Sequence, residues 1–465
     1  MHSEFYQEED LKGSLSSFEQ SLKRDEVKYF EVHEFEFIID HYLTVGDIDN
    51  CKNALQSAFN IHPNSHEINK RLAQFNNLEG QFDLAIKLIE NTYRAHGIAK
   101  DIDYYLILGE ALLSVQKPQK AKEAFNQAIR ISGDEYFDIV TTVAALYQQE
   151  GFFEQVIYHL RKIEQEDSSL LFDIALAYHN LFDFENAIKY FKRFIPTAPF
   201  SVDVWYYISK SYQAIFDNIS AEDALLNAIA LDPEMIVYQY DLAKVYINQE
   251  KYLEALELYK EILSKDKNVN HSIFLSIGDI SYNLEQYENS LKNYEIALRL
   301  NPESSEAFHS IGQVHIELEN YHIAKQNIQK AISIDASKAD FFVSLGTINQ
   351  LLGDNPSAEY AFIEATRINP SLETAWNLLI DFYFFSEKPE LSLKTAYKAI
   401  HTFGNQNQLL CKISASYFDM KDNEKGLSYL KKALNQDQSS SDFFLEYYPE
   451  GKHELSIMNL INLFV

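Results

Sequence analysis

The stretch that decides the fold is VDVWYYISKSYQAIFDNISAEDALLNAIALDP, residues 202–233. Its pattern of large apolar residues, small residues and a closing proline recurs along the chain with a period of 34 residues. Pro199 precedes Pro233 by one period, and Pro302 follows after about two. A fixed period of roughly 20–50 residues is the signature of a repeat architecture, in which each repeat is one supersecondary unit. The chain is therefore predicted to be an array of such repeats.

Sliding this pattern along the sequence gives twelve repeats that cover residues 32–440 of the 465. Eleven have 34 residues and one, at Phe137, has 31. Position 8 is small in ten repeats, and position 20 is small in all but one, which has Val156. Two antiparallel helices approach closely only where both present short side chains, so each repeat is expected to be a helical hairpin. The repeats begin at Val32, His66, Ile102, Phe137, Ser168, Val202, Ile236, His271, Ser305, Ala339, Glu373 and Asn407.

The order of residues within a repeat resembles the tetratricopeptide repeat, a helix–turn–helix unit. This resemblance implies an all-α fold, namely an α-solenoid wound as a right-handed superhelix with two antiparallel helices per repeat. It also implies a binding role, because such repeats seldom catalyse reactions. In the repeat at Val202 the pattern positions 4, 7, 8, 11, 20, 24 and 27 are Trp205, Ile208, Ser209, Tyr212, Ala221, Leu225 and Ala228.

Three segments are predicted: residues 1–31, residues 32–440 and residues 441–465. The first is acidic, and its helical apolar spacing from Ser14 to Phe30 indicates a helix that caps the array. The second is the repeat array, and the third is a C-terminal cap.

The final stretch, Leu455–Val465, is predicted to be an apolar helix with one narrow polar stripe. A terminal cap normally presents a polar outer face to water. The helix is therefore expected to pack into the last repeats with one face, against Phe384, Phe385 and Phe418, and to have no obvious partner in the chain for the other. It would then contact a second molecule, such as another copy in a weak homodimer.

Charge and composition restrict the partners. The chain has 69 acidic and 40 basic residues, a net charge of -29, which disfavours nucleic acid and anionic membrane surfaces. No apolar run reaches the roughly 18 residues that membrane insertion needs. The acidic N-terminus is unlike a secretory signal, and Cys51 and Cys411 are far apart in the sequence. These features favour a reducing, cytoplasmic location.

Motifs for catalysis and for cofactors are absent from the sequence. It contains no glycine-rich nucleotide loop, no zinc-protease motif, no EF-hand loop and no nucleophile elbow. His62 and His66 are four residues apart, but Pro63 lies between them at a helix junction, which argues against a metal pair. We therefore expect no cofactor, no metal and no enzymatic activity.

The family resemblance implies a concave groove lined by the first helices, with positions 2, 5, 9, 12 and 13 pointing inward. Chaperone-binding members hold a peptide carboxylate with Lys at position 5 and Asn at position 9. Here only Lys70 satisfies position 5, and its partner is Gln74, so this clamp is expected to be absent. A different polar and aromatic set occupies the groove positions of the middle repeats: Tyr206, Lys210, Gln213, Tyr240, Lys244, Asn248, Asp279, Tyr282, Asn283, His309 and Gln313.

Equivalent positions of adjacent repeats stack, so Tyr206 is expected beside Tyr240 and Lys210 beside Lys244. Aromatic faces with amide and ammonium donors suit an extended peptide that carries acidic groups. The alternative is that the lysines are solvated groove residues that balance nearby acids.

The leading hypothesis is a cytoplasmic scaffold or adaptor that holds a partner protein or peptide in this groove. The alternative is a non-catalytic structural subunit of a permanent enzyme or envelope-assembly complex. A peptide-sensing regulator is a third reading, but such proteins usually join their repeats to a DNA-binding domain, and residues 1–31 are too short and too acidic for one.

Overall fold

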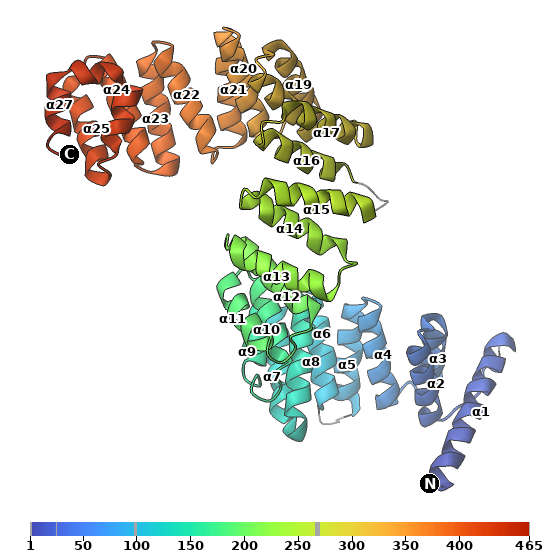
Figure 1. Cartoon of the computed structure of the whole chain (residues 1–465). Helices are drawn as coiled ribbons and strands as arrows, with labels where there is room; N and C mark the ends of the chain where they lie inside the picture. The colour runs from blue at the N-terminus through green and yellow to red at the C-terminus, as the bar shows by residue number, and fades with distance from the viewer. Residues whose placement is uncertain (1, 25, 97–99, 266–269, 465) are drawn as a thin grey trace. The chain divides into compact units, whose positions relative to one another are not determined.

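The fold is all-α, as predicted. A computed structural model describes residues 2–24, 26–96, 100–265 and 270–464, with side chains from residue 13 onward except 95 and 96. These residues form 27 α-helices and two short 3-10 segments, without a β-strand among them. Most helices follow one another as antiparallel pairs along the chain (Figure 1). The chain divides into two compact halves, Met1–Tyr238 and Gln239–Val465.

The N-terminal half contains thirteen α-helices and one 3-10 segment among its described residues. They are α1 (His2–Arg24), α2 (Val32–Val45), α3 (Ile48–Ile61), α4 (His66–Leu78), α5 (Phe82–His96), α6 (Ile102–Ser114), α7 (Pro118–Ile131), η1 (Gly133–Glu135), α8 (Tyr136–Gln149), α9 (Phe153–Leu160), α10 (Leu170–Asn180), α11 (Phe184–Phe194), α12 (Val202–Ala214) and α13 (Asn218–Leu231).

The division between the halves falls within α14 (Ile236–Asn248). The C-terminal half continues with α15 (Tyr252–Lys265), α16 (His271–Asn283), α17 (Tyr287–Leu300), α18 (Ser305–Glu317), α19 (Tyr321–Ile334), α20 (Ala339–Leu351), α21 (Asn355–Ile368), α22 (Glu373–Phe385), α23 (Pro389–Phe403), α24 (Asn407–Asp419), α25 (Asn423–Gln436), α26 (Ser440–Tyr447), η2 (Pro449–His453) and α27 (Leu455–Ile461).

The helix boundaries follow the 34-residue frame. Ten of the twelve predicted repeats begin at the first residue of a helix, whereas α8 begins one residue before Phe137 and α10 begins two residues after Ser168. The repeat at Phe137 is shortened in its second helix, because α9 has only 8 residues. The division into three segments, at residues 31 and 440, stays a prediction.

The small residues at position 8 allow the two helices of a repeat to touch. A Cβ added at Gly278 would lie 2.4 Å from the ring of Tyr294, and one added at Gly346 would lie 2.6 Å from that of Phe362. In both repeats the contacting side chain is at position 24, on the second helix. A larger residue at position 8 would therefore push the helices apart.

The turn between the two helices is built alike in all twelve repeats. Position 15 has a positive φ between 57° and 76° each time, the left-handed conformation that ends an α-helix. Glycine adopts this conformation without steric cost, whereas other residues do not. The twelve residues are Gly46, Gly80, Gln116, Gly151, Phe182, Phe216, Glu250, Glu285, Glu319, Gly353, Glu387 and Lys421.

The N-terminal helix differs from the prediction. Helical apolar spacing extends to Phe30, but α1 ends at Arg24 and residues 26–31 are not helical. Phe18 and Phe30 both pack against Phe35, with a distance of 5.9 Å between the rings of the first two. A straight helix cannot bring both rings to one residue of α2, so the chain leaves the helix to bury Phe30.

The C-terminal helix also differs. The described helix is α27, seven residues from Leu455 to Ile461, and Val465 lies outside the described residues. Ile457 and Ile461, which belong to its two predicted faces, are both buried in one cluster with Leu430 of α25. The prediction that one face lacks a partner in the chain is therefore wrong. The segment 440–453 provides part of the packing surface, and the 34-residue pattern does not extend to it.

Candidate functional site

A hollow of about 410 Å³ lies between the first helices α10 and α12, with the start of α11 and the turn before it at its edge. We call it the aromatic hollow, because five of its eight lining residues carry rings. The lining joins positions 12, 13, 15 and 17 of the repeat at Ser168 to positions 5, 6, 9 and 13 of the repeat at Val202. It consists of His179, Asn180, Phe182, Phe184, Tyr206, Tyr207, Lys210 and Ala214.

One wall of the hollow is held by His179. Its Nδ1 lies 2.8 Å from the Ser211 hydroxyl, and its ring meets Phe184 and Tyr207 edge to face at centroid distances of 5.4 and 6.0 Å. Burial, and secondarily the charge of Lys210, lower the pKa of this imidazole. The ring is therefore neutral at physiological pH, and the wall is mainly apolar.

Lys210 and Tyr206 form the opposite side. The Lys210 ammonium lies 5.3 Å from the centre of the Tyr206 ring, a cation–π geometry, and that ring lies 5.0 Å from Tyr238. Both residues have further contacts within the chain. Two of the predicted groove residues thus lie together in the hollow, and no carboxylate belongs to its described lining.

The other predicted residues near this point fall on both sides of the division between the halves. Gln213 is half-buried in the N-terminal half, and its Nε2 has no hydrogen-bond partner among the described residues. In the C-terminal half, the ring of Tyr240 lies 6.3 Å from Tyr259, and Lys244 lies 3.5 Å from the buried carboxylate of Asp241. The predicted pairing of Tyr206 with Tyr240, and of the two lysines, stays a prediction.

The remaining predicted residues lie on α14, α16 and α18. Asn248 and Asn283 are exposed, and Gln313 is half-buried. Tyr294 donates a hydrogen bond of 2.6 Å to Asp279, and Tyr282 donates one of 3.1 Å to Glu317. His309 lies 2.9 Å from the Ser344 hydroxyl and stacks on Phe341 at 4.7 Å.

Three of these side chains, Asp279, Tyr282 and His309, are therefore engaged in contacts within the array. Burial raises the pKa of the Asp279 carboxyl and lowers that of His309, and burial together with Glu317 raises the pKa of Tyr282 to about 12.

Sequence reasoning missed six of the eight residues that line the hollow. Phe182, Phe184 and Tyr207 stand at positions 15, 17 and 6, which are outside the groove positions that the family resemblance supplies. His179 stands at position 12, and its repeat precedes those that we considered. The high density of aromatic residues between 172 and 207 is the sequence feature that could have indicated this hollow.

A second stretch of first-helix surface is filled by the chain itself. Tyr447 of α26 stacks on Phe384 at 4.9 Å, lies 5.4 Å from Phe385 and donates a hydrogen bond of 2.9 Å to Asp381. Lys412 completes this arrangement with a contact of 2.8 Å to Asp381. We call this surface the filled groove.

The occupant of the filled groove differs from the prediction. Phe384 and Phe385 were expected to receive the helix at 455–465, but Tyr447 of α26 takes that place, and Tyr448 stacks on Phe418 at 6.0 Å. Side chains just after the last full repeat reach the groove first, because only a short turn separates α25 from α26.

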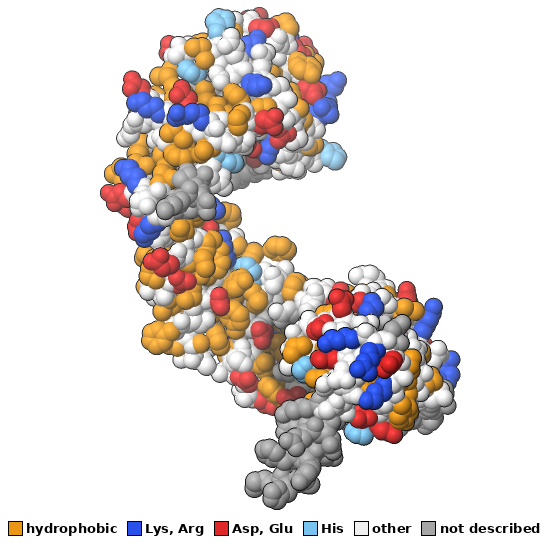
Figure 2. Space-filling model, turned by 90° about the vertical axis from the view of Figure 1, so that its right-hand side faces the viewer, with side chains coloured by type: hydrophobic (Ala, Val, Ile, Leu, Met, Phe, Trp, Pro, Cys, Tyr) orange, Lys and Arg blue, Asp and Glu red, His pale blue; other side chains and the backbone are white. Residues whose placement is uncertain are grey.

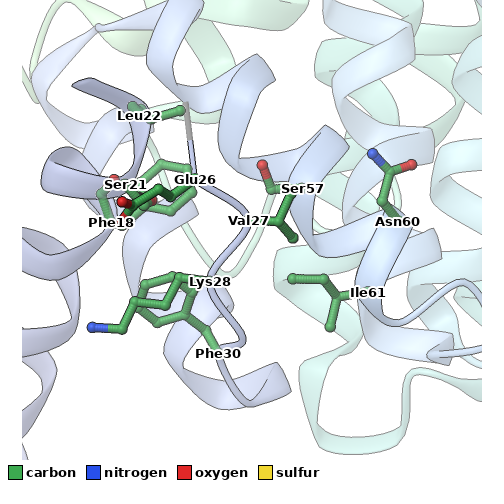
Figure 3. Close-up of a pocket in the computed structure, with 10 residues that line it drawn as sticks. All are labelled: Phe18, Ser21, Leu22, Glu26, Val27, Lys28, Phe30, Ser57, Asn60 and Ile61. Atoms are coloured by element: carbon green, nitrogen blue, oxygen red, sulfur yellow. Dashed lines mark hydrogen bonds between the residues drawn. The ribbon is translucent and has the colours of Figure 1, made fainter. Parts of the chain in front are cut away.

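Two other hollows lie away from these surfaces. A hollow of about 190 Å³ lies where α1 meets α3 and the segment 26–30, with Phe18 and Phe30 on one side and Ser57 and Ile61 on the other (Figure 3). It has room for about one side chain and marks the contact of α1 with the first repeat.

A larger hollow, of about 660 Å³, lies across α5, α6 and α7. Its lining includes three lysines and two glutamates, so it has no strong preference for one sign of charge.

Surface charge is mixed. Acidic and basic side chains are interspersed with hydrophobic ones on the face shown in Figure 2. Within the described ranges, no group of three or more His, Cys, Asp or Glu side chains is arranged to hold a metal ion. None of the described helices has the length and apolarity to cross a membrane.

Comparison with known proteins identifies the repeats. The profile of the tetratricopeptide repeat family matches residues 102–135, 168–196, 271–304 and 305–338. Each match begins at the first residue of a repeat derived above from the 34-residue spacing. The chain therefore contains tetratricopeptide repeats. The prediction of the family, and of its α-solenoid class of fold, is confirmed.

Two curated relatives match about half of the chain. The chain is 22% identical over 262 residues to the TPR repeat-containing protein YpiA of Bacillus subtilis, covering 56% of this chain and 61% of the relative. It is 24% identical over 225 residues to the BBSome complex member BBS4 of Bos taurus, covering 48% of this chain and 42% of the relative. The chain thus spans less than two thirds of either relative.

Solved tetratricopeptide structures align with this protein at low identity. Yeast Tom70 aligns with a TM-score of 0.47 and 13% identity, covering 83% of this chain and 96% of the other. YrrB, described as a TPR protein with an unusual peptide-binding site, aligns with a TM-score of 0.31 and 20% identity, covering 40% of this chain and 96% of the other.

Proposed function

We propose that this tetratricopeptide repeat protein is a non-catalytic, cytoplasmic scaffold or adaptor that holds an extended segment of a partner protein on its first helices. The observation that carries the proposal is the aromatic hollow. A concave site lined by rings and a few polar groups is the usual form of a binding site, and buried aromatic residues dominate binding energy at protein interfaces. Cys51 and Cys411, both free and buried, agree with a reducing compartment.

The filled groove supports a peptide as the ligand. There the first helices α22 and α24 receive a tyrosine from a separate segment of the chain, with ring stacking and a hydrogen bond to Asp381. The same face of the repeats at Ser168 and Val202 presents rings of its own. A side chain from another protein therefore has the same kind of surface available to it at the aromatic hollow.

The ligand contacts that we propose include the eleven groove residues predicted from the sequence, with Lys210 and Lys244 as the groups that meet an acidic side chain. Lys244 already faces Asp241 at 3.5 Å, and Lys210 has contacts of its own. An acidic group of the partner would therefore be recognised together with these contacts, and the apolar part of the peptide would supply most of the binding energy.

The test is a charge reversal with a matched control. We expect Lys210→Glu combined with Lys244→Glu to abolish capture of the partner that the unchanged protein retains, with an unchanged helical circular-dichroism spectrum. Lys189→Glu combined with Lys260→Glu makes the same charge change at exposed positions of the second helices α11 and α15, and should leave capture intact. Equal capture by both double variants would reject the groove assignment.

A permanent, non-catalytic subunit is the second candidate function, because one relative is named as a member of a complex. Washing a captured complex at moderate salt separates the two functions: a groove-bound peptide dissociates, whereas a permanent partner stays. The predicted weak homodimer through residues 455–465 belongs to this alternative. Leu455 and Leu463 are 77% and 80% exposed, and light scattering before and after deletion of residues 453–465 tests the dimer.

A further inference from the structure

The twelve turns between paired helices provide an internal comparison. All of them place position 15 in the left-handed conformation, and ten use glycine or a polar residue there. The two exceptions are consecutive. Phe182 and Phe216 have φ values of 61° and belong to the repeats that form the aromatic hollow.

The stability of the fold does not explain why phenylalanine occupies this position in either turn. A bulky side chain at positive φ is strained, and glycine is favoured at this position of a helix end. Burial of the ring could offset such strain, but Phe182 is 79% exposed and Phe216 is 84% exposed. An outlier that is both strained and exposed is characteristic of functional surfaces.

The two rings belong to a longer apolar edge. Ile215 and Ile219, on either side of Phe216, are 40% and 74% exposed. Equivalent positions of adjacent repeats lie on the same edge of a solenoid, so Phe182 continues this line. Phe182 also lines the aromatic hollow, with its ring 6.0 Å from that of Phe184. We call the four residues Phe182, Ile215, Phe216 and Ile219 the turn ridge.

The charged residues next to the turn ridge in the sequence are all acidic. Within three residues of either phenylalanine the charged residues are Asp183, Glu185 and Asp217, and no lysine or arginine occurs there. Asp183 and Asp217 accept hydrogen bonds from the backbone of α11 and α13, which holds their carboxylates at the edge. Lys210 shares the lining of the aromatic hollow with Phe182, so it faces the part of a bound segment that enters the hollow.

We infer that the turn ridge is the second half of the partner-binding surface, and that it takes an amphipathic segment whose apolar side chains are flanked by lysine or arginine. This inference rests on the proposed function and adds the chemistry of the partner. The apolar side chains pack between the two phenylalanines and enter the hollow beyond Phe182. The flanking basic groups meet Asp183, Glu185 and Asp217.

Replacement by glycine tests the ridge, because its effects on stability and on binding have opposite signs. In Phe182→Gly combined with Phe216→Gly, the strain and two exposed rings are removed, so the melting temperature should stay the same or rise. Gln116→Gly relieves the same strain at a turn of the N-terminal half that is remote from the ridge, and serves as the control.

The probe is a phage-displayed library of random peptides selected on the full chain. We expect enrichment of peptides with apolar residues next to lysine or arginine, with at least a tenfold loss of binding to the double glycine variant and none to Gln116→Gly. Enrichment of acidic peptides, or no enrichment, would overturn the inference.

Equal binding to the double glycine variant would also overturn the inference. If those same peptides were lost on Lys210→Glu, the proposed groove function would stand and only the ridge would fail.

Discussion

The filled groove and the aromatic hollow lie on the same face of different repeats, but only the filled groove is completed by the chain itself. At the filled groove, Tyr447 covers Phe384, and Asp381 binds both Tyr447 and Lys412. At the hollow, rings from α10, α11, α12 and the turn between α10 and α11 line an open space of about 410 Å³. Rings on first helices therefore form a surface that is covered by a neighbouring segment of the chain at the filled groove and is open at the hollow.

Buried polar groups show the same contrast. In the described stretch 350–464, every buried side-chain nitrogen and oxygen has a hydrogen-bond partner. In the region of α8–α12, the hydroxyl of Tyr147, both ring nitrogens of His159 and the Nε2 of Gln213 have none among the described residues. Unpartnered buried polar groups are costly to a fold. The C-terminal end thus buries its polar side chains with their hydrogen bonds formed, whereas the region of α8–α12 buries several without partners.

Loss of the C-terminal closure should have the largest effect on stability. Phe444 of α26 is fully buried in the cluster that joins α24, α25 and α27, so Phe444→Ala should cost about 3–5 kcal/mol locally. Hydrogen exchange of α24–α27 measures it, since a repeat array does not unfold in a single step. Phe182→Ala, at an exposed ring, should change local stability by less than about 0.5 kcal/mol. Equal effects would remove the contrast between the two regions.

Acid should destabilise the region of α8–α10 through His159. Burial, followed by the charges of Lys162 and Lys122, lowers the pKa of this imidazole from 6.5 to about 4. The unfolded chain therefore binds a proton that the folded chain rejects, so stability is full above pH 6.5 and falls as the pH drops toward 4, by up to about 3 kcal/mol.

The control for this pH effect is His159→Leu, which removes the titrating group. Hydrogen exchange of α8–α10 between pH 7 and pH 4.5 should show a loss of protection in the unchanged protein that is smaller in the variant. An identical pH dependence in both proteins would show that another group titrates.

The two helices of a repeat touch in both regions. Overpacking this helix contact should therefore lower stability by a similar amount in any repeat. A Cβ at Gly312 would lie 2.6 Å from Ile328, and Ala324 is fully buried on the facing helix. Gly312→Leu or Ala324→Leu should therefore cost about 1–3 kcal/mol by overpacking. Ile323→Leu, at the exposed neighbouring position, is the control. An unchanged melting curve for both overpacked variants would mean that the repeat frame is misplaced.

The smallest effect is expected for the hydroxyl of Tyr447. Tyr447→Phe keeps the stacking on Phe384 and removes one hydrogen bond to Asp381, which retains its contact with Lys412. The cost should be about 1 kcal/mol in the exchange protection of α26. Tyr360→Phe, at a ring that is 62% exposed, should have no effect. A loss as large as that of Phe444→Ala would show that the polar contacts, and not the apolar packing, hold the groove closed.

The sequence by itself determined the repeat and its frame. Small residues at positions 8 and 20 are steric requirements of two touching helices, so they recur at a fixed spacing and can be read without a structure. Gly278 under Tyr294 is one such requirement. Lys210 and Tyr206 were found in the same way, because the family resemblance fixes which positions face the groove.

Only the tertiary structure decided how those positions are used. His309 carries a groove position but binds Ser344 of the next repeat, and Tyr447 fills a groove that helix spacing assigned to residues 455–465. The exposure of Phe182 and Phe216 is equally invisible to a pattern that counts both as apolar. The physical reason is the sequence distance of the contacts. Residue spacing along a helix reports contacts within one repeat. Occupancy of the groove depends on segments that meet only after the chain has folded.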